Sequence, residues 1–192
     1  MERIPDWNHE VPAELTPEPL AVEEMVQPCY PFQGQILPHL EKNIQISHFQ
    51  DTFTSLNMQF TQSYGNSLSE HKAKFAPLKN FHPREDFSPV FLGHAKLYIL
   101  ADTYGIMPLV DQDLYKLGAT LAHFRLCEDN VNDVVELVRC SYQGTRPRDA
   151  LRTLVTTYVL SVLGQIGESN CFQELLAEGG DFVLDFWQMI WG

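Results

Sequence analysis

The chain has 192 residues, of which 44% are hydrophobic, and a formal net charge of −12, which suits one ordinary globular domain or a small domain with an added arm. The acidic balance argues against nucleic acid and anionic membrane surfaces as partners, because both require clustered Lys and Arg. No apolar run approaches the roughly 20 residues that span a bilayer, and the four scattered cysteines lack paired spacing, so we expect an intracellular protein with reduced thiols.

Residues 1–31 are expected to form a disordered acidic arm. They contain six prolines and seven acidic residues against one basic residue. Proline removes backbone hydrogen-bond donors, and the excess of negative charge resists collapse. This segment is therefore not expected to contribute to a packed core.

Residues 32–87 are expected to be partly ordered, with few elements. A short helix is predicted over residues 36–46, with Pro38 in its first turn. Residues 52–61 alternate between apolar and polar side chains, and a period of two is typical of a half-buried strand. The apolar side of this predicted strand consists of Leu56, Met58 and Phe60.

Residues 88–192 are predicted to form a compact bundle of about six helices, because short loops make successive helices antiparallel neighbours. The first helix is expected to start with Ser88 as its cap and Pro89 as its first residue. Gly105 is expected to end this helix in the left-handed conformation. The small side chains of Ala95 and Ala101 are expected to face a neighbouring helix. The fold class is therefore mostly α.

The later helix boundaries follow from prolines, capping residues and glycines. Prolines are expected to open the second and fourth helices, and a cap at residues 128–130 precedes the third, which ends at Gly144. A capping box is expected to open the fifth helix, which ends at Gly179 and Gly180, and Asp181 caps the sixth. Pro108 opens the second helix, Pro147 opens the fourth, and Asn170 with Gln173 forms the capping box of the fifth.

The order of these helices resembles a known family. Residues 94–106 resemble the paired helices that close a BTB/POZ domain. Three later stretches resemble the helical tail of fungal BTB-domain-containing proteins, namely residues 134–142, 151–155 and 172–180. The resemblance implies an adaptor that binds other proteins, with a cullin-type scaffold among the family's partners. The family's strand core is not recognisable in residues 1–87, so no cullin-binding residue can be assigned.

One pair of side chains has the spacing of metal ligands. His123 and Cys127 lie four residues apart at the predicted end of the second helix, but a zinc site needs four ligands and no second pair follows. A packed histidine and a buried cysteine are the favoured interpretation. Because the chain also lacks a nucleophile elbow and a glycine-rich phosphate loop, we expect no catalytic residue, no metal and no cofactor.

Two groups of residues are candidates for binding a protein partner. Large aromatic side chains serve as interface anchors, and the last helix carries Phe182, Trp187 and Trp191. Equally, Phe182, Phe186 and residues 190–191 fit a stripe that packs back on the bundle, with the core favoured for Phe186 and Ile190, and Trp187 lies off this stripe. The second group consists of basic side chains around a predicted turn in an otherwise acidic chain, namely Arg146, Arg148 and Arg152. They would bind an acidic segment or remain solvated.

The sequence therefore predicts a non-enzymatic protein–protein interaction module that resembles the C-terminal part of a BTB adaptor. The first alternative is a degenerate or truncated relative with a private partner and no ubiquitin-ligase role. The second is a metal-dependent enzyme that uses His and Cys. The protein partner stays unidentified, a homo-oligomer is compatible with the pattern, and the choice between cytoplasm and nucleus is open.

Overall fold

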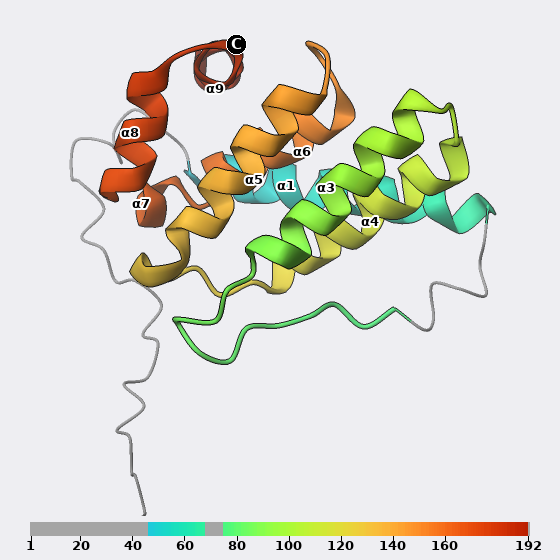
Figure 1. Ribbon diagram of the computed structural model, residues 1–192, viewed down its shortest axis with the longest axis horizontal. Helices are drawn as coiled ribbons and strands as arrows, with labels where there is room; N and C mark the ends of the chain where they lie inside the picture. The colour runs from blue at the N-terminus through green and yellow to red at the C-terminus, as the bar shows by residue number, and fades with distance from the viewer. Residues whose placement is uncertain (1–45, 68–74, 192) are drawn as a thin grey trace, which may run out of the picture.

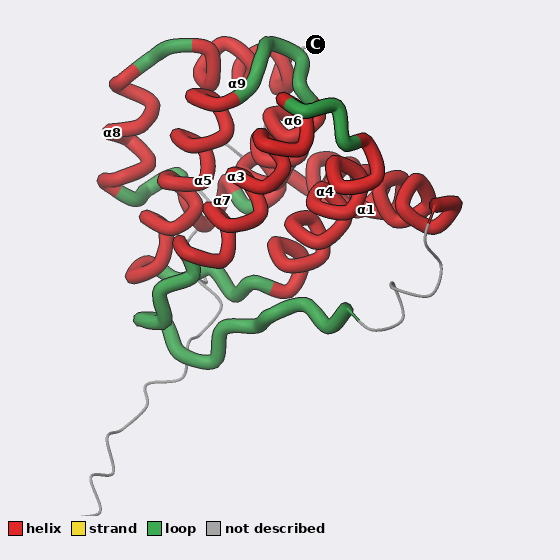
Figure 2. Tube along the Cα trace, turned by 45° about the vertical axis from the view of Figure 1, so that its right-hand side comes forward, coloured by secondary structure: helices red, strands yellow, loops and turns green. Residues whose placement is uncertain are grey.

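The computed structural model describes residues 46–67 and 75–191 (Figure 1). The predicted arm at residues 1–31 lies outside the described residues, and so does the predicted helix at residues 36–46 apart from its last residue. The described part contains helices and no strand (Figure 2). The mostly α fold class is therefore confirmed.

Eight α-helices and one short 3-10 helix make up the described part. In chain order they are α1 (Ile46–Ser67), α3 (Ser88–Thr103), α4 (Met107–His123), η1 (Glu128–Asn130), α5 (Val131–Gly144), α6 (Ala150–Ser161), α7 (Leu163–Ile166), α8 (Asn170–Glu178) and α9 (Asp181–Trp191). Helix α3 packs against α4 and α5, α5 packs against α6 and α8, and α6 packs against α9. Helix α1 packs against α4 and α6, on the side of the bundle away from α3 (Figure 1).

The predicted strand at residues 52–61 is wrong, because this segment lies inside the 22-residue helix α1. A longer window explains the error. Apolar residues recur every three or four positions along α1, which is the helical period, and the alternation around Leu56 and Phe60 is a local coincidence. Met58, which the strand would have buried, is 56% exposed. The inward stripe of α1 consists of Phe49, Phe53, Leu56, Phe60 and Tyr64.

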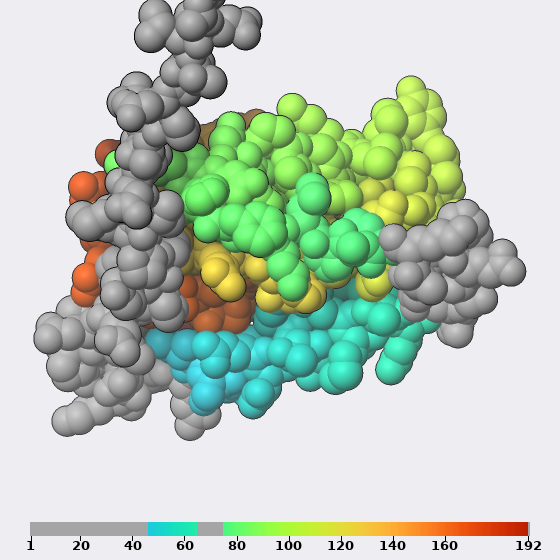
Figure 3. Space-filling view, turned by 90° about the horizontal axis from the view of Figure 1, so that it is seen from below, coloured from blue at the N-terminus to red at the C-terminus, as the bar shows by residue number. Residues whose placement is uncertain are grey.

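The core continues from α1 into the rest of the bundle. Phe53 is 7% exposed and packs against the ring of Tyr158 in α6, with 5.3 Å between ring centroids. The Asn57 side-chain amide donates to the Gly118 carbonyl of α4 at 3.3 Å. In Figure 3, α1 (cyan) and the α3 region (green) lie on opposite sides of the segment around the end of α4 (yellow). The core therefore includes side chains of α1 as well as those of residues 88–192.

Several predicted features of the bundle are confirmed. Ala95 and Ala101 are fully buried, so the small-residue face of α3 is the packed face. Gly105, Gly179 and Gly180 have φ values of 67°, 73° and 86°, in the left-handed region that costs glycine least. These glycines end α3 and separate α8 from α9.

The predicted start of α3 is wrong in its details. Ser88 is the first residue of α3 rather than its cap, and the start of this helix is held by Asp133 of α5. The two Asp133 carboxylate oxygens accept the Phe87 backbone N–H and the Ser88 hydroxyl, each at 2.9 Å. Asp86 also accepts the Ser88 backbone N–H, at 3.0 Å. The start of α3 is therefore held by a local carboxylate and by one from another helix, and local sequence spacing does not reveal the second.

The starts of α6 and α8 also differ from the prediction. Pro147 lies in the turn before α6, and Asp149 caps this helix by accepting the Leu151 N–H at 2.8 Å. Ser169 occupies the cap position of α8 and makes no side-chain capping bond, so the predicted capping box at Asn170 is wrong. Boundary shifts of this size are common where several polar residues adjoin a helix start.

Candidate functional site

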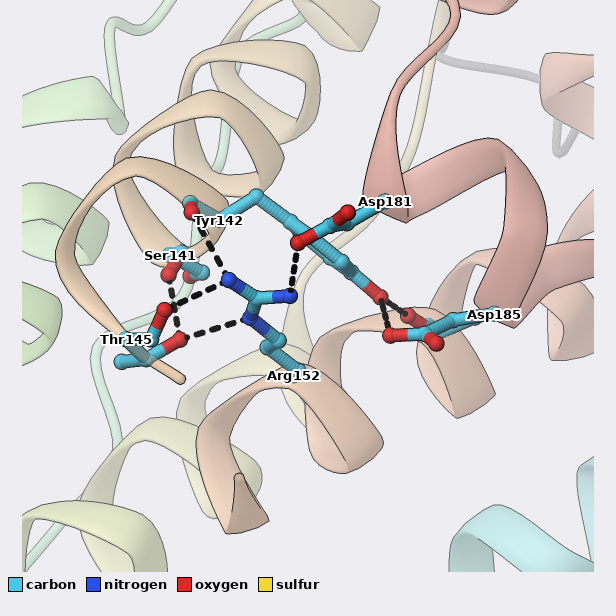
Figure 4. A network of polar contacts seen from close by, with 7 residues as sticks. Ser141, Tyr142, Thr145, Arg152, Asp181 and Asp185 are labelled. Atoms are coloured by element: carbon cyan, nitrogen blue, oxygen red, sulfur yellow. Dashed lines mark hydrogen bonds and ion pairs between the residues drawn. The ribbon is translucent and has the colours of Figure 1, made fainter. Parts of the chain in front are cut away.

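Arg152 of α6 holds the start of α9 against the bundle (Figure 4). Its side chain is 5% exposed, and one guanidinium nitrogen donates to the Asp181 carboxylate at 2.8 Å. The remaining donors reach the backbone carbonyls of Tyr142 and Thr145 and the Thr145 hydroxyl. The guanidinium also lies 4.6 Å from the centre of the Tyr142 ring, a cation–π distance. Each of the three guanidinium nitrogens therefore donates to a protein acceptor.

Tyr142 makes a second polar connection to α9. Its hydroxyl donates to the Asp185 carboxylate at 2.9 Å and lies 2.7 Å from the Thr156 hydroxyl of α6. Burial raises the pKa of the Tyr142 hydroxyl, and the hydrogen bond to Asp185 acts in the same direction. The phenol thus remains a neutral donor that joins α5, α6 and α9.

Aromatic packing completes the inner face of α9. Phe182 and Phe186 are each 4% exposed. The Phe182 ring contacts the Tyr142 ring, and the Phe186 ring contacts Phe172 of α8. Phe182 and Arg152, both predicted as partner-binding residues, are therefore inside the protein, and the prediction is corrected for these two. Arg152 forms an ion pair with Asp181 of its own chain.

The outer face of α9 carries a row of exposed apolar side chains. Leu184 is 62% exposed, Trp187 is 49% exposed and Trp191 is 72% exposed. These residues lie three and four positions apart, so they form one stripe along the helix. We call Leu184, Trp187 and Trp191 the α9 stripe. The structure places Trp187 and Trp191 at the surface, as the sequence predicted, and adds Leu184, which the sequence analysis missed.

Leu184 could have been found from helical spacing alone, since it lies three positions before Trp187. The sequence analysis considered only aromatic anchors and so overlooked a leucine. The other predicted contacts, Arg146 and Arg148, are exposed in the turn between α5 and α6. Neither forms an ion pair within the described part of the chain. Arg148 has a φ of 65°, a left-handed conformation that is uncommon for a residue with a side chain.

A cavity of about 450 Å³ lies between α1, the end of α4 and the end of α6. This volume is within the range of small-molecule pockets. Phe53 and Tyr158 form part of its apolar wall, Gln50 and Asn57 contribute amides, and no lining residue is charged. The Tyr158 hydroxyl is buried with no hydrogen-bond partner within the described residues. Such a lining admits a neutral, largely apolar group and offers no acid–base pair for catalysis.

His123 and Cys127, the pair with the spacing of metal ligands, do not lie as the sequence analysis expected. α4 ends at His123, which is exposed and has its Nδ1 atom 2.8 Å from the Ala119 carbonyl oxygen. Cys127 lies in the loop beyond the helix, so His123 is neither packed nor on a common helix face with it. His94 and Asp113 make a 3.4 Å contact between α3 and α4, but two ligands do not make a zinc site. Among the described residues, no three His, Cys, Asp or Glu side chains group around a metal position.

Cys140 and Cys171 are free and half-buried. Within the described helices, none combines the length and the apolar character needed to cross a membrane.

Comparisons with models of known families, with characterised proteins and with solved structures find no match to this chain.

Proposed function

We propose that the protein is a protein–protein interaction module whose contact surface is the α9 stripe. The observation that carries this proposal is the exposure of two tryptophans and a leucine in one row on a helix whose opposite face is packed. Tryptophan is enriched among interface residues that dominate binding energy. The helix is also held in place by Arg152 and Tyr142, so it presents the stripe on a rigid support.

The BTB-like adaptor remains part of this proposal. The stretches that resemble the family's closing helices and helical tail coincide with α3, α5, α6 and α8. The alternative of a relative with a private partner and no ubiquitin-ligase role is kept beside it. The metal-dependent enzyme has no ligand cluster to support it within the described part of the chain.

Affinity capture with the full chain tests the proposal. Three tagged proteins are compared, namely the unaltered chain, Trp187→Ala, and Tyr104→Ala as the control. Tyr104 is a suitable control because it is 72% exposed directly after the end of α3, away from the α9 stripe. Captured proteins are identified by quantitative mass spectrometry.

The expected result is a set of partners that Trp187→Ala loses and Tyr104→Ala retains. If Trp187 is an anchor, its removal weakens binding by about 2 kcal/mol, which is roughly 30-fold. Trp187 also contacts the Phe186 ring at 5.9 Å, so thermal melting must show that the variant remains folded. Retention of every partner by folded Trp187→Ala would refute the assignment of this surface.

The intracellular location also belongs to this proposal, supported by the free thiols of Cys140 and Cys171. Disulfides persist in oxidising compartments. Rapid acid quenching of cells followed by alkylation tests the location. Recovery of Cys140 and Cys171 as free thiols is expected for an intracellular protein, and their quantitative recovery in disulfides would contradict that location.

A further inference from the structure

The cavity between α1, the end of α4 and the end of α6 is a second candidate site, and we call it the α1 cavity. None of its described lining residues belongs to α8 or α9, so it is separate from the α9 stripe. Its volume is about 450 Å³. At roughly 30 Å³ for each water-sized group, this volume holds about 15 non-hydrogen atoms of a ligand.

The floor of the α1 cavity is apolar and buried. It consists of Phe53 from α1, Tyr158 from α6, and Leu121 from α4, together with Phe124 and Leu126 beyond the end of α4. Removal of such surface from water is favourable in proportion to the area covered. The floor therefore favours a ligand with an apolar body.

The helix α1 forms one long side of the cavity. Gln50, Thr54, Asn57 and Thr61 all line it and lie three or four positions apart, so a single face of the helix follows the cavity. The eleven-residue step from Gln50 to Thr61 corresponds to roughly 16 Å along the helix. A volume of about 450 Å³ over this length leaves a mean cross-section of about 28 Å². The shape thus suits an extended chain rather than a compact ring system.

The lining also selects the charge of the ligand. None of the described lining residues is charged, although charged residues make up 20% of the chain and its net charge is −12. A ligand charge in the cavity would lose water without meeting an opposite charge, which is unfavourable. The ligand is therefore expected to be neutral.

Two polar groups of the lining have no hydrogen-bond partner within the described residues. The hydroxyls of Thr54, Thr61 and Ser161 donate to backbone carbonyls, so they are already used. The Gln165 side chain makes no hydrogen bond there, and the Tyr158 hydroxyl is buried without a partner. Buried donors are nearly always paired in native proteins. A ligand oxygen would supply the acceptor that Tyr158 lacks.

We propose that the α1 cavity binds a neutral amphiphile, namely an unbranched apolar chain of about ten carbons that ends in an uncharged group with an oxygen acceptor. The chain covers Phe53 and the rest of the buried floor. The oxygen accepts from the Tyr158 hydroxyl, and the Gln165 amide binds the remaining polar atoms. This site and the proposed function of the α9 stripe are independent of each other.

Three ten-carbon probes test the proposal on the full chain by isothermal titration calorimetry at about pH 8, where a carboxylic acid and an alkylamine are both charged. The probes are decanamide, decanoate and decylammonium, which differ only in the end group. Decanamide should bind at least about 10-fold more tightly than either ion. The comparison with decylammonium is the stricter one, because the net charge of −12 by itself favours a cation.

A substitution that fills the cavity locates the bound probe. Thr54 is exposed and lies in the middle of the α1 side, so Thr54→Trp should abolish decanamide binding. Ser55→Trp is the matched control, because Ser55 is the exposed neighbour and does not line the cavity. Trp187→Ala should leave decanamide binding unchanged, which excludes adsorption to the α9 stripe. Thermal melting must show that each variant is folded.

Tyr158→Phe gives two further measurements. Without ligand, this variant should be at least as stable in urea as the unaltered chain, because it removes a buried donor that has no partner. With ligand, decanamide should bind several-fold more weakly to it, as expected for the loss of one hydrogen bond.

Several results would overturn the proposal. These are failure of decanamide to bind, equal binding of decanamide and either ion, retained binding by folded Thr54→Trp, or loss of binding in Trp187→Ala. A marked loss of stability in ligand-free Tyr158→Phe would show that the hydroxyl already has a partner in the chain, and unchanged decanamide affinity of this variant would show that the ligand does not contact it. None of these results bears on partner capture through Trp187, so the two proposals can fail separately.

Discussion

Replacement of Arg152 by Met tests the role of the buried guanidinium in holding α9. Methionine nearly preserves the side-chain volume and removes every donor. The carbonyls of Tyr142 and Thr145 then lose their hydrogen bonds, and a partly buried acceptor that is left unsatisfied costs about 1–3 kcal/mol. Asp181 contributes less, because its side chain is 56% exposed and water can replace the arginine. We therefore expect a loss of about 3 kcal/mol in the free energy of unfolding.

Urea unfolding followed by circular dichroism measures this loss. Arg146→Met is the matched control, because Arg146 is exposed in the neighbouring turn and surface substitutions usually change stability by less than about 0.5 kcal/mol. In a Trp7→Phe background, which leaves Trp187 and Trp191 as the only tryptophans, the tryptophan emission of Arg152→Met should also shift to the red if α9 detaches. A stability loss below about 1 kcal/mol, with unchanged emission, would refute the view that Arg152 fastens α9.

Three further outcomes follow from the fold. Phe53→Ala should lower the free energy of unfolding in urea by about 3 kcal/mol. This is at the low end for a phenylalanine, because Phe53 adjoins the cavity and water can enter. Substitution of the exposed Met58 by Ala should cost little, and equal effects of the two substitutions would contradict the packing of α1. Burial raises the pKa of the Tyr98 and Tyr158 hydroxyls above their ordinary value of 10.0, with Asp149 adding to the effect at Tyr98. Because the folded state holds these protons more tightly, their contribution to stability is complete below about pH 10 and declines above it. The tyrosinate absorbance of Tyr98 and Tyr158 should therefore appear together with the loss of helical circular dichroism rather than before it. Burial also raises the pKa of the Cys140 thiol, so iodoacetamide at about pH 8 should alkylate it more slowly than a peptide thiol, and urea should abolish the difference.

Much of the bundle could be predicted from local sequence. Gly105, Gly179 and Gly180 mark helix ends because the left-handed conformation is least costly without a Cβ atom. The apolar stripes of α4, α5 and α6 have the helical period, so these helices were found. Helix α1 was missed because a ten-residue window contains both a period of two and part of a helical stripe. A longer window shows the helical period, and contact with α4 and α6 agrees with it, since Phe53 and Tyr64 are buried and Met58 is left in solvent.

In the candidate site, too, some residues could be placed from the sequence and others could not. Trp187 could be placed at the surface because it lies off the stripe that packs Phe186, and that relation is fixed by the geometry of a single helix. The fate of Arg152 depends on residues 7 to 29 positions away in the sequence, namely Thr145 and Asp181. The sequence by itself determined a mostly helical chain with an aromatic last helix. Only the tertiary structure decided which of its charged and aromatic side chains are used internally, because a buried guanidinium is stable only where several distant acceptors converge on it.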